Sequence, residues 1–231
     1  MTHAFPEADR PPPRMKIFAC AVFACVLTAL VGLLLATSSA KHTQVVRAAT
    51  TAPSGTAPAY TADGKLLFPY KYREWIYLTT GMDMSYTPMS GMSGQSTFDN
   101  VFVNPEAYRS FLQTGTWPDK TIILIEARGA QTRGSINKSG HFQGSAIEAL
   151  EVHVKDDART PGAWAFYSFN SENPAEKIPT TADCYSCHQQ HAAVATTFVQ
   201  FYPTLLPIAK AKNTLSAEFL KDEAEHQKPE H

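Results

Sequence analysis

Apolar and polar residues alternate along five short segments of the chain, as they do in β-strands that bury one face. These segments are also rich in β-branched and aromatic residues, and they are 75–78, 98–103, 121–128, 150–155 and 164–169. Parallel strands would need helical crossovers between them, and the sequence shows no such crossovers. The pattern therefore predicts an α+β fold with a mainly antiparallel sheet.

The signals between and after these strands are helical or loop-like. Asn104 is a candidate N-cap, Pro105 suits the first helical position, and Gly115 ends the apolar periodicity, which predicts a short helix. The Gly- and Ser-containing loop 129–140 suggests that the strands on either side are antiparallel neighbours. The tail 216–226 is dominated by charges, so we expect a short solvated helix there.

An uncharged apolar segment precedes the predicted strands. It covers residues 17–36, directly after Arg14 and Lys16. Its 20 residues are enough to span a membrane as a helix, which favours a retained anchor, whereas the small residues 38–40 would suit cleavage of a signal peptide before Lys41. Both alternatives export the rest of the chain, because the positive charges hold the N-terminus inside. We therefore expect a periplasmic protein, either anchored in the membrane or released.

Composition divides the chain into three parts. Residues 1–40 form the signal or anchor segment, residues 41–64 a flexible linker rich in Thr, Ala and Pro, and residues 65–231 the folded domain with its C-terminal tail. The formal net charge is only -1, and charges of both signs are interspersed. Phosphate binding needs a basic face, so the sequence excludes nucleic acid as the expected partner.

The motif Cys184-Tyr-Ser-Cys187-His188 carries the predicted chemistry. Cys20 and Cys25 lie in the apolar segment, so only two cysteines remain in the exported part. Two thiols at this spacing can add to the two vinyl groups of one porphyrin, and the adjacent imidazole can bind its iron. The sequence therefore predicts one haem c, attached through Cys184 and Cys187, with His188 as the iron ligand on a helix after the last strand.

Two other uses of the cysteines fit the sequence less well. A structural zinc site needs further ligands, which only His141, His153 or His191 could supply. A redox dithiol usually follows a strand of a βαβ unit, and that context is missing.

The ligand on the second face of the iron is not determined by the motif. His191 lies one turn after His188 and cannot reach that face. The Gly- and Ser-rich loop contains four methionines, any of which could donate a thioether: Met82, Met84, Met89 and Met92. A thioether ligand would give a six-coordinate electron carrier, although methionines more often fill gaps in packing.

An ordered series of motifs resembles the cytochrome P460 family. The series runs through 72–75 (YREW), 101–108 (VFVNPEAY), 115–119 (GTWPD), 154–156 (VKD) with 162–164 (GAW), and the CxxCH motif. The resemblance implies one c-type haem on a small antiparallel β domain, with His188 as the only protein axial ligand, an open distal side and a homodimer. It also implies a function in binding or oxidising small nitrogen compounds such as hydroxylamine or nitric oxide, with a periplasmic redox partner.

In this family, one lysine separates the members that oxidise hydroxylamine from those that bind gases. Members that oxidise hydroxylamine carry a lysine linked to the porphyrin, whereas the related cytochromes c′-beta lack the link and bind nitric oxide or carbon monoxide. The resemblance puts that position near Ile125, and no lysine occurs within 121–128. Lys120 is the nearest lysine, so hydroxylamine oxidation, electron transfer and gas binding without turnover all stay open.

A carboxylate interrupts the apolar segment 121–128. Glu126 shares a strand face with Leu124 and Arg128 under strict alternation. Beside a haem it could accept protons from a bound substrate, with Arg128 lowering its pKa. A simple ion pair between Glu126 and Arg128 at the sheet edge is the commoner cause of such a pattern.

Overall fold

The computed structural model describes residues 56–84 and 96–226. The predicted anchor 17–36, Cys20, Cys25, Met89 and Met92 lie outside the described residues. Within the described part of the chain, no helix has the length and hydropathy needed to cross a membrane.

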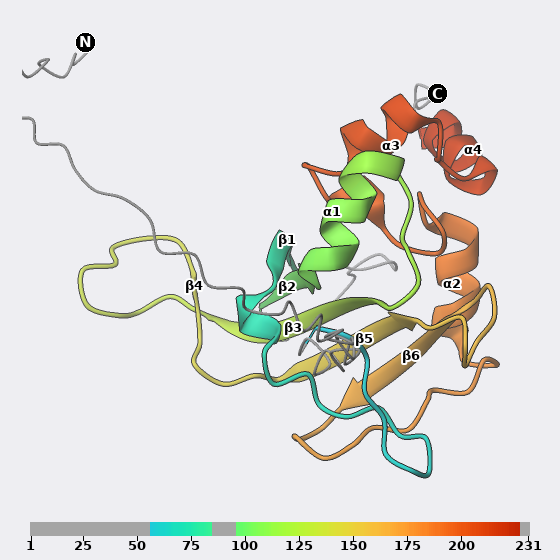
Figure 1. Cartoon of the computed structure of the whole chain (residues 1–231). Coiled ribbons are helices and arrows are strands. Elements are labelled where there is room, and N and C mark those ends of the chain that lie inside the picture. Colours follow the sequence, from blue (N-terminus) through green and yellow to red (C-terminus); the bar gives the residue numbers. More distant parts are fainter. Residues whose placement is uncertain (1–55, 85–95, 227–231) are drawn as a thin grey trace, which may run out of the picture. The chain divides into compact units, whose positions relative to one another are not determined.

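The core of the domain is a six-stranded antiparallel sheet (Figure 1). Its five longer strands lie in the order β1 (Ile76–Met82), β2 (Thr97–Val103), β3 (Thr121–Gln131), β5 (Ala149–Lys155) and β6 (Trp164–Phe169). The two-residue strand β4 (Phe142–Gln143) pairs with the end of β3. Each of the five predicted segments coincides with one of the longer strands, so the α+β prediction is confirmed.

Four helices accompany the sheet in the described residues: α1 (Pro105–Thr114), α2 (Asp183–His191), α3 (Leu206–Lys212) and α4 (Ala217–His226). Short 3-10 helices cover Tyr72–Glu74 (η1) and Val199–Phe201 (η2). As predicted, α1 begins after Asn104 and ends at Gly115, which has the left-handed φ of 74° that glycine adopts without strain. Helix α3 was not predicted from the sequence.

The tail forms α4, but the expectation of a solvated helix is wrong for one of its side chains. Phe219 is buried in the hydrophobic core, whereas Leu220 is half exposed. The charged residues next to Phe219 in the sequence point to other sides of the helix. The single apolar side chain of Phe219 is therefore enough to pack α4 against the core.

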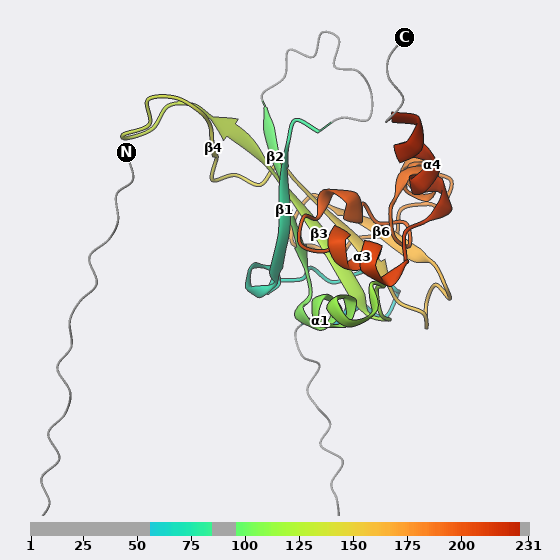
Figure 2. The same cartoon turned by 90° about the horizontal axis from the view of Figure 1, so that it is seen from above.

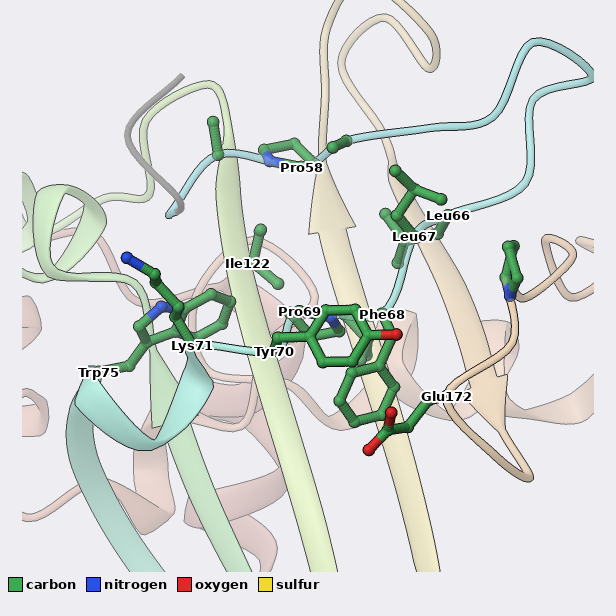
Figure 3. Close-up of a pocket in the computed structure, with 14 residues that line it drawn as sticks. Pro58, Leu66, Leu67, Phe68, Pro69, Tyr70, Lys71, Trp75, Ile122 and Glu172 are labelled. Carbon is green, nitrogen blue, oxygen red and sulfur yellow. The ribbon is translucent and has the colours of Figure 1, made fainter. Parts of the chain in front are cut away.

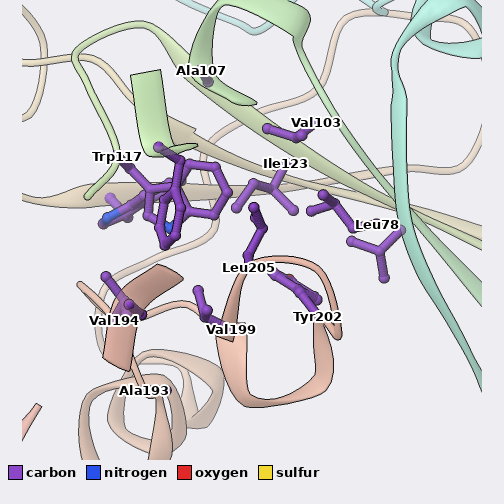
Figure 4. Close-up of a cluster of buried hydrophobic side chains, with 14 of the residues drawn as sticks. Leu78, Val103, Ala107, Trp117, Ile123, Ala193, Val194, Val199, Tyr202 and Leu205 are labelled. Atoms are coloured by element: carbon purple, nitrogen blue, oxygen red, sulfur yellow. The ribbon is translucent and has the colours of Figure 1, made fainter. Parts of the chain in front are cut away.

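Both faces of the sheet are buried, because residues of each strand alternate between two hydrophobic clusters. The helix-side core joins one sheet face to all four helices and contains Leu78, Val103, Ile123, Trp117, Val194, Val199 and Leu205 (Figures 1, 2 and 4). The opposite core lies on the other face and contains Leu66, Tyr72, Trp75, Ile122, Leu124, Val152 and Phe169. Any functional side chain on a strand therefore belongs to one of two chemically separate faces.

Candidate functional site

Helix α2 carries the CxxCH motif directly after the last strand, as predicted. Cys184, Cys187 and His188 occupy positions i, i+3 and i+4 of the helix, so they share one face. Both thiols are free and half-buried, and burial raises the pKa of Cys187, with the neighbouring Cys184 adding to the shift. No residue of α2 is fully buried, which leaves this face open to a large group.

Contacts at both ends fix the position of α2. The Tyr185 hydroxyl accepts a hydrogen bond from the Phe166 N–H at 3.0 Å and donates one to the Ile178 carbonyl at 3.1 Å. The rings of Tyr185 and Phe166 also stack, with centroids 4.3 Å apart. At the other end, His191 Nδ1 lies 3.0 Å from Asp222 Oδ2 of α4. His191 is thus engaged with α4, and the helix is held against both β6 and the tail.

The hydrogen bond of His188 suits an iron ligand. Its Nδ1 lies 2.8 Å from the Thr196 carbonyl oxygen, an acceptor, so Nδ1 carries the proton and Nε2 keeps its lone pair. The carbonyl belongs to a tight turn in which Ala195 and Thr196 both have positive φ, at 46° and 60°. Burial lowers the pKa of His188, against the opposing effect of this hydrogen bond, and therefore favours the neutral imidazole that a metal requires.

Three rings surround the His188 imidazole and fix its orientation. Phe198 and Phe166 lie 4.3 Å and 4.8 Å from it, and His153 meets it edge-on at 4.7 Å between centroids. His153 itself stacks on Phe166 at 4.0 Å, and burial lowers its pKa well below the ordinary value, with His188 adding to the shift. The imidazole of His188 therefore sits in a rigid, mostly apolar cage.

A cavity of about 350 Å³ opens over the sheet face that α2 covers, and we call it the sheet cavity. Its walls are Thr79 and Gly81 of β1, Asp99 and Val101 of β2, Ile125 and Ala127 of β3, Ala149 and Glu151 of β5, and Met84, Phe198, Phe201 and Tyr202. A second cavity of about 730 Å³ is lined by Cys187 and shares Phe198 and Phe201 with the first. The rings of Phe198 and Phe201 therefore lie between a cavity at Cys187 and a cavity at the sheet.

Two carboxyl groups line the sheet cavity. Glu151 of β5 is exposed at the wall, and Asp99 of β2 is half-buried; both face the same side as Ile125 of β3. Burial by surrounding protein atoms raises the pKa of both, and the two are coupled because Asp99 raises the pKa of Glu151 further. Neither has a hydrogen-bond or ion-pair partner in the described residues, which leaves both free to exchange protons with a ligand.

Glu126 and Arg128 lie on the other face of the sheet. Glu126 is 2% exposed and accepts hydrogen bonds from Arg128, from the Tyr72 hydroxyl and, at 2.7 Å, from Arg73. Arg128 also donates to the Ser145 carbonyl at 2.6 Å. Glu126 and Arg128 therefore form an ion pair with each other, on the sheet face opposite to His188. Their role in proton transfer stays a prediction.

Lys120, the lysine nearest to the position of the family's cross-link, lies outside the sheet cavity. Lys120 precedes β3, forms an ion pair with Asp156, and does not line the sheet cavity. Ile125, which the resemblance puts at the position of the family's lysine, is part of the cavity wall. The cavity thus presents an apolar side chain where a cross-linking lysine would stand.

Of the methionine loop, the described part contains Met82 and Met84. Met84 lines the sheet cavity and packs against Gly81, where an added Cβ would overlap its sulfur. Met82 is partly exposed and is not a wall residue.

These residues fit a covalently attached haem. Two free thiols and an oriented neutral imidazole share one helix face, and the cavity of about 730 Å³ lined by Cys187 adjoins that face. A zinc site would need further ligands close to the thiols. Among the described residues, no group of three or more potential ligands is placed to hold a metal ion.

Sequence reasoning missed Glu151 and Asp99. A signal was available for Glu151, because it alternates with His153 on a strand, so the two side chains share a face. Knowing that this face meets α2, however, requires the register between strands and the path of the chain after β6.

Comparison with known proteins identifies the domain. The family model described as Cytochrome P460 matches residues 69–199, more than half of the chain. The match begins before η1 and ends in η2, so it includes every strand of the sheet and the CxxCH helix. No curated protein matches the chain.

Proposed function

We propose, from the premise that the chain belongs to the cytochrome P460 family, that it is an exported mono-haem c cytochrome that binds or oxidises small nitrogen compounds. The observation that supports this most is a neutral His188 whose ring lies 4.3 Å from Phe198, a wall residue of the sheet cavity that also holds two acidic groups. Hydroxylamine and nitric oxide are small enough to enter a cavity of about 350 Å³.

Each site residue has a distinct part in this proposal. Cys184 and Cys187 would hold the haem, and His188 would bind its iron. The haem supplies an iron centre that binds nitrogen ligands and changes its oxidation state. Glu151 accepts protons that an N–H or O–H substrate loses, and Asp99 tunes its pKa by charge repulsion.

The apolar part of the cavity sets which ligands can enter. Val101 and Ile125 form an apolar part of the wall beside the two carboxyl groups and limit the size of the ligand that fits there. The electrons of an oxidised substrate would pass to a redox partner protein in the periplasm. We also infer a homodimer and, if the segment 17–36 is retained, attachment to the membrane.

The lysine cross-link is not part of the proposed site. Lys120 is engaged by Asp156 outside the sheet cavity, and Ile125 occupies the matching wall position. We therefore expect Lys120→Ala to leave the optical spectrum of the haem-loaded protein unchanged. A spectrum that shifts on this substitution would contradict the placement of the family's lysine at Ile125.

One specific observation favours the alternative function, a six-coordinate electron-transfer cytochrome. Met84 lines the sheet cavity, so its thioether is the candidate for a sixth iron ligand in an electron-transfer cytochrome. The open-site proposal is preferred, because Met84 packs on Gly81 in the wall and the two carboxyl groups serve no purpose in an electron carrier.

One optical experiment separates these functions. The haem-loaded protein is reduced, its spectrum is recorded, and nitric oxide is added. We expect a high-spin c-type spectrum without the strong red shift of a cross-linked haem, and a large change on adding the gas. A low-spin spectrum that ignores nitric oxide, and becomes sensitive to it in Met84→Ala, would instead establish the electron carrier.

A further inference from the structure

A tight turn carries the carbonyl group that accepts the hydrogen bond of His188. Val194 and Thr197 face each other across this turn, and each backbone N–H donates to the other's carbonyl, at 3.2 Å from Val194 and 2.8 Å from Thr197. The two central residues, Ala195 and Thr196, both have the positive φ of a type I′ turn. Asparagine and glycine are usual at these positions, so an alanine followed by a β-branched threonine makes the turn strained.

A strained turn keeps its conformation only where neighbouring contacts hold it. The Thr196 side chain supplies no such contact, because its Oγ1 is buried without a hydrogen-bond partner in the described part of the chain. The Thr197 hydroxyl does supply one, since it donates to the Val194 carbonyl at 2.6 Å and accepts from the Trp117 indole N–H at 2.7 Å. The turn is therefore tied to a residue 80 positions earlier in the chain.

Trp117 is a firm point of attachment. Its side chain is 3% exposed and belongs to the helix-side core (Figure 4). Its ring packs on Phe111 of α1, with centroids 4.3 Å apart. Thr197 is also buried, so both partners of the hydrogen bond are shielded from water, and losing one of them would leave the other unpaired at a cost.

The planar peptide group between Thr196 and Thr197 links this hydrogen bond to His188. In a trans peptide, the carbonyl and the N–H point to opposite sides. The Thr197 N–H is held by the Val194 carbonyl, so the Thr196 carbonyl points the other way, where it lies 2.8 Å from His188 Nδ1. A movement of Thr197 would therefore turn the acceptor away from the imidazole.

We propose that Trp117 is a positioning residue for the iron ligand: through Thr197 it holds the peptide whose carbonyl accepts the hydrogen bond of His188. This inference rests on the proposed function, in which His188 binds the haem iron. A hydrogen bond from Nδ1 raises the basicity of Nε2, which strengthens its bond to iron and lowers the reduction potential. Trp117 lines neither the sheet cavity nor the cavity at Cys187, so it acts on the iron only through the turn.

Two measurements on the full-length, haem-loaded protein test this role. Resonance Raman spectroscopy of the reduced protein gives the iron–histidine stretching frequency, and a redox titration gives the reduction potential. Trp117→Phe keeps an aromatic ring beside Phe111 but removes the donor, so we expect the frequency to shift down and the potential to shift up. Trp164→Phe, which also removes a buried indole from the helix-side core, is the matched control and should change neither value.

Substitutions of Thr197 test the link itself. Thr197→Val removes the hydroxyl at nearly the same shape, so both shifts should have the same direction as in Trp117→Phe and be at least as large. Thr197→Ser keeps the hydroxyl and should keep the wild-type values. Adding Trp117→Phe to Thr197→Val should produce no further shift, because the two residues act through one hydrogen bond.

Three results would overturn the role of Trp117. These are unchanged values in Trp117→Phe, a further shift in the double variant, and, if Trp117→Phe takes up no haem, equal values in Thr197→Val and Thr197→Ser. A wild-type protein without an iron–histidine band would overturn the ligand assignment as well. Nitric oxide binding to a Trp117→Phe protein with wild-type frequency and potential would contradict this inference alone and leave the proposed function standing.

Discussion

Two glutamates on adjacent strands show how a single position decides the chemistry of a side chain. Glu126 pairs across the sheet with Leu150, and Glu151 pairs with Ile125. Because side chains alternate between faces, Glu126 enters the opposite core and Glu151 the sheet cavity. The sequence identified Glu126, which interrupts an apolar segment. Glu151 was missed, because its alternation with His153 shows only that the two share a face and not that this face lines a cavity.

The role of Glu151 is tested by Glu151→Gln. If the protein oxidises hydroxylamine, we expect the rate to fall about 100-fold, the lower end for losing a general base. The wild-type rate should rise with pH as Glu151 loses its proton, above the pH range of an ordinary glutamate because its pKa is raised, and the variant should lack this dependence. Glu148→Gln, on an exposed residue before β5, is the control, and equal rates in the two variants would remove Glu151 from the mechanism.

Glu126 is expected to act on stability. Burial alone would raise its pKa, but the hydrogen bonds from Arg128 and Tyr72 and the charge of Arg73 outweigh burial and lower it. A lowered pKa in the folded state stabilises the protein above the unfolded pKa, and this contribution is lost as pH falls through the folded value.

We therefore expect Glu126→Gln to lower the free energy of unfolding by about 3 kcal/mol at pH 7, because Arg128 loses its buried counter-charge. The difference from wild type should shrink on acidification below the ordinary pKa of a glutamate. Chemical denaturation at pH 7 and at pH 4 measures both values. A difference that stays constant with pH would mean that the charge of Glu126 is irrelevant to folding.

The strands were predictable because one physical rule, alternation of buried and exposed residues, holds along each of them. Helix α1 was predictable from its proline start and glycine end. Helix α3 was missed because it has only seven residues and no side-chain N-cap. The burial of Phe219 depends on contacts between segments far apart in the chain, which no local pattern records.

The junction between α1 and α3 gives a prediction about packing. Gly115 has a φ of 74°, and a Cβ added there would meet Lys212 Cβ at 2.7 Å and Thr214 Oγ1 at 2.9 Å. We expect Gly115→Ala to lower the free energy of unfolding by about 2 kcal/mol, from backbone strain and this overlap together.

Gly140→Ala is the matched control. Gly140 has a similar φ of 81°, but nothing lies within 4 Å of an added Cβ. It should therefore show the backbone strain alone, about 1 kcal/mol. Equal losses in urea denaturation of the two variants would contradict a close contact between α1 and α3.

The two faces of the sheet carry different structural features. The helix-side face holds the sheet cavity and the cage around His188. The opposite face holds the hydrogen bonds of Glu126 and a separate cavity of about 370 Å³, whose wall includes Phe68, Tyr70 and Trp75 (Figure 3).

The haem motif could be recognised in the sequence because its three residues lie within five consecutive positions, 184–188. The sheet cavity could not, because its walls come from four strands, η2 and three residues outside these elements, Met84, Phe198 and Tyr202.

The account depends on a haem bound covalently at Cys184 and Cys187, and the mass of the mature protein tests this most directly. The full chain is produced with export and c-type haem maturation, extracted with acidified acetone, and measured by intact mass spectrometry beside Cys184→Ala/Cys187→Ala. We predict that the wild-type chain is heavier by the mass of one haem after extraction and that the double variant is not. A wild-type chain without the added mass, or a double variant that keeps it, would contradict the account.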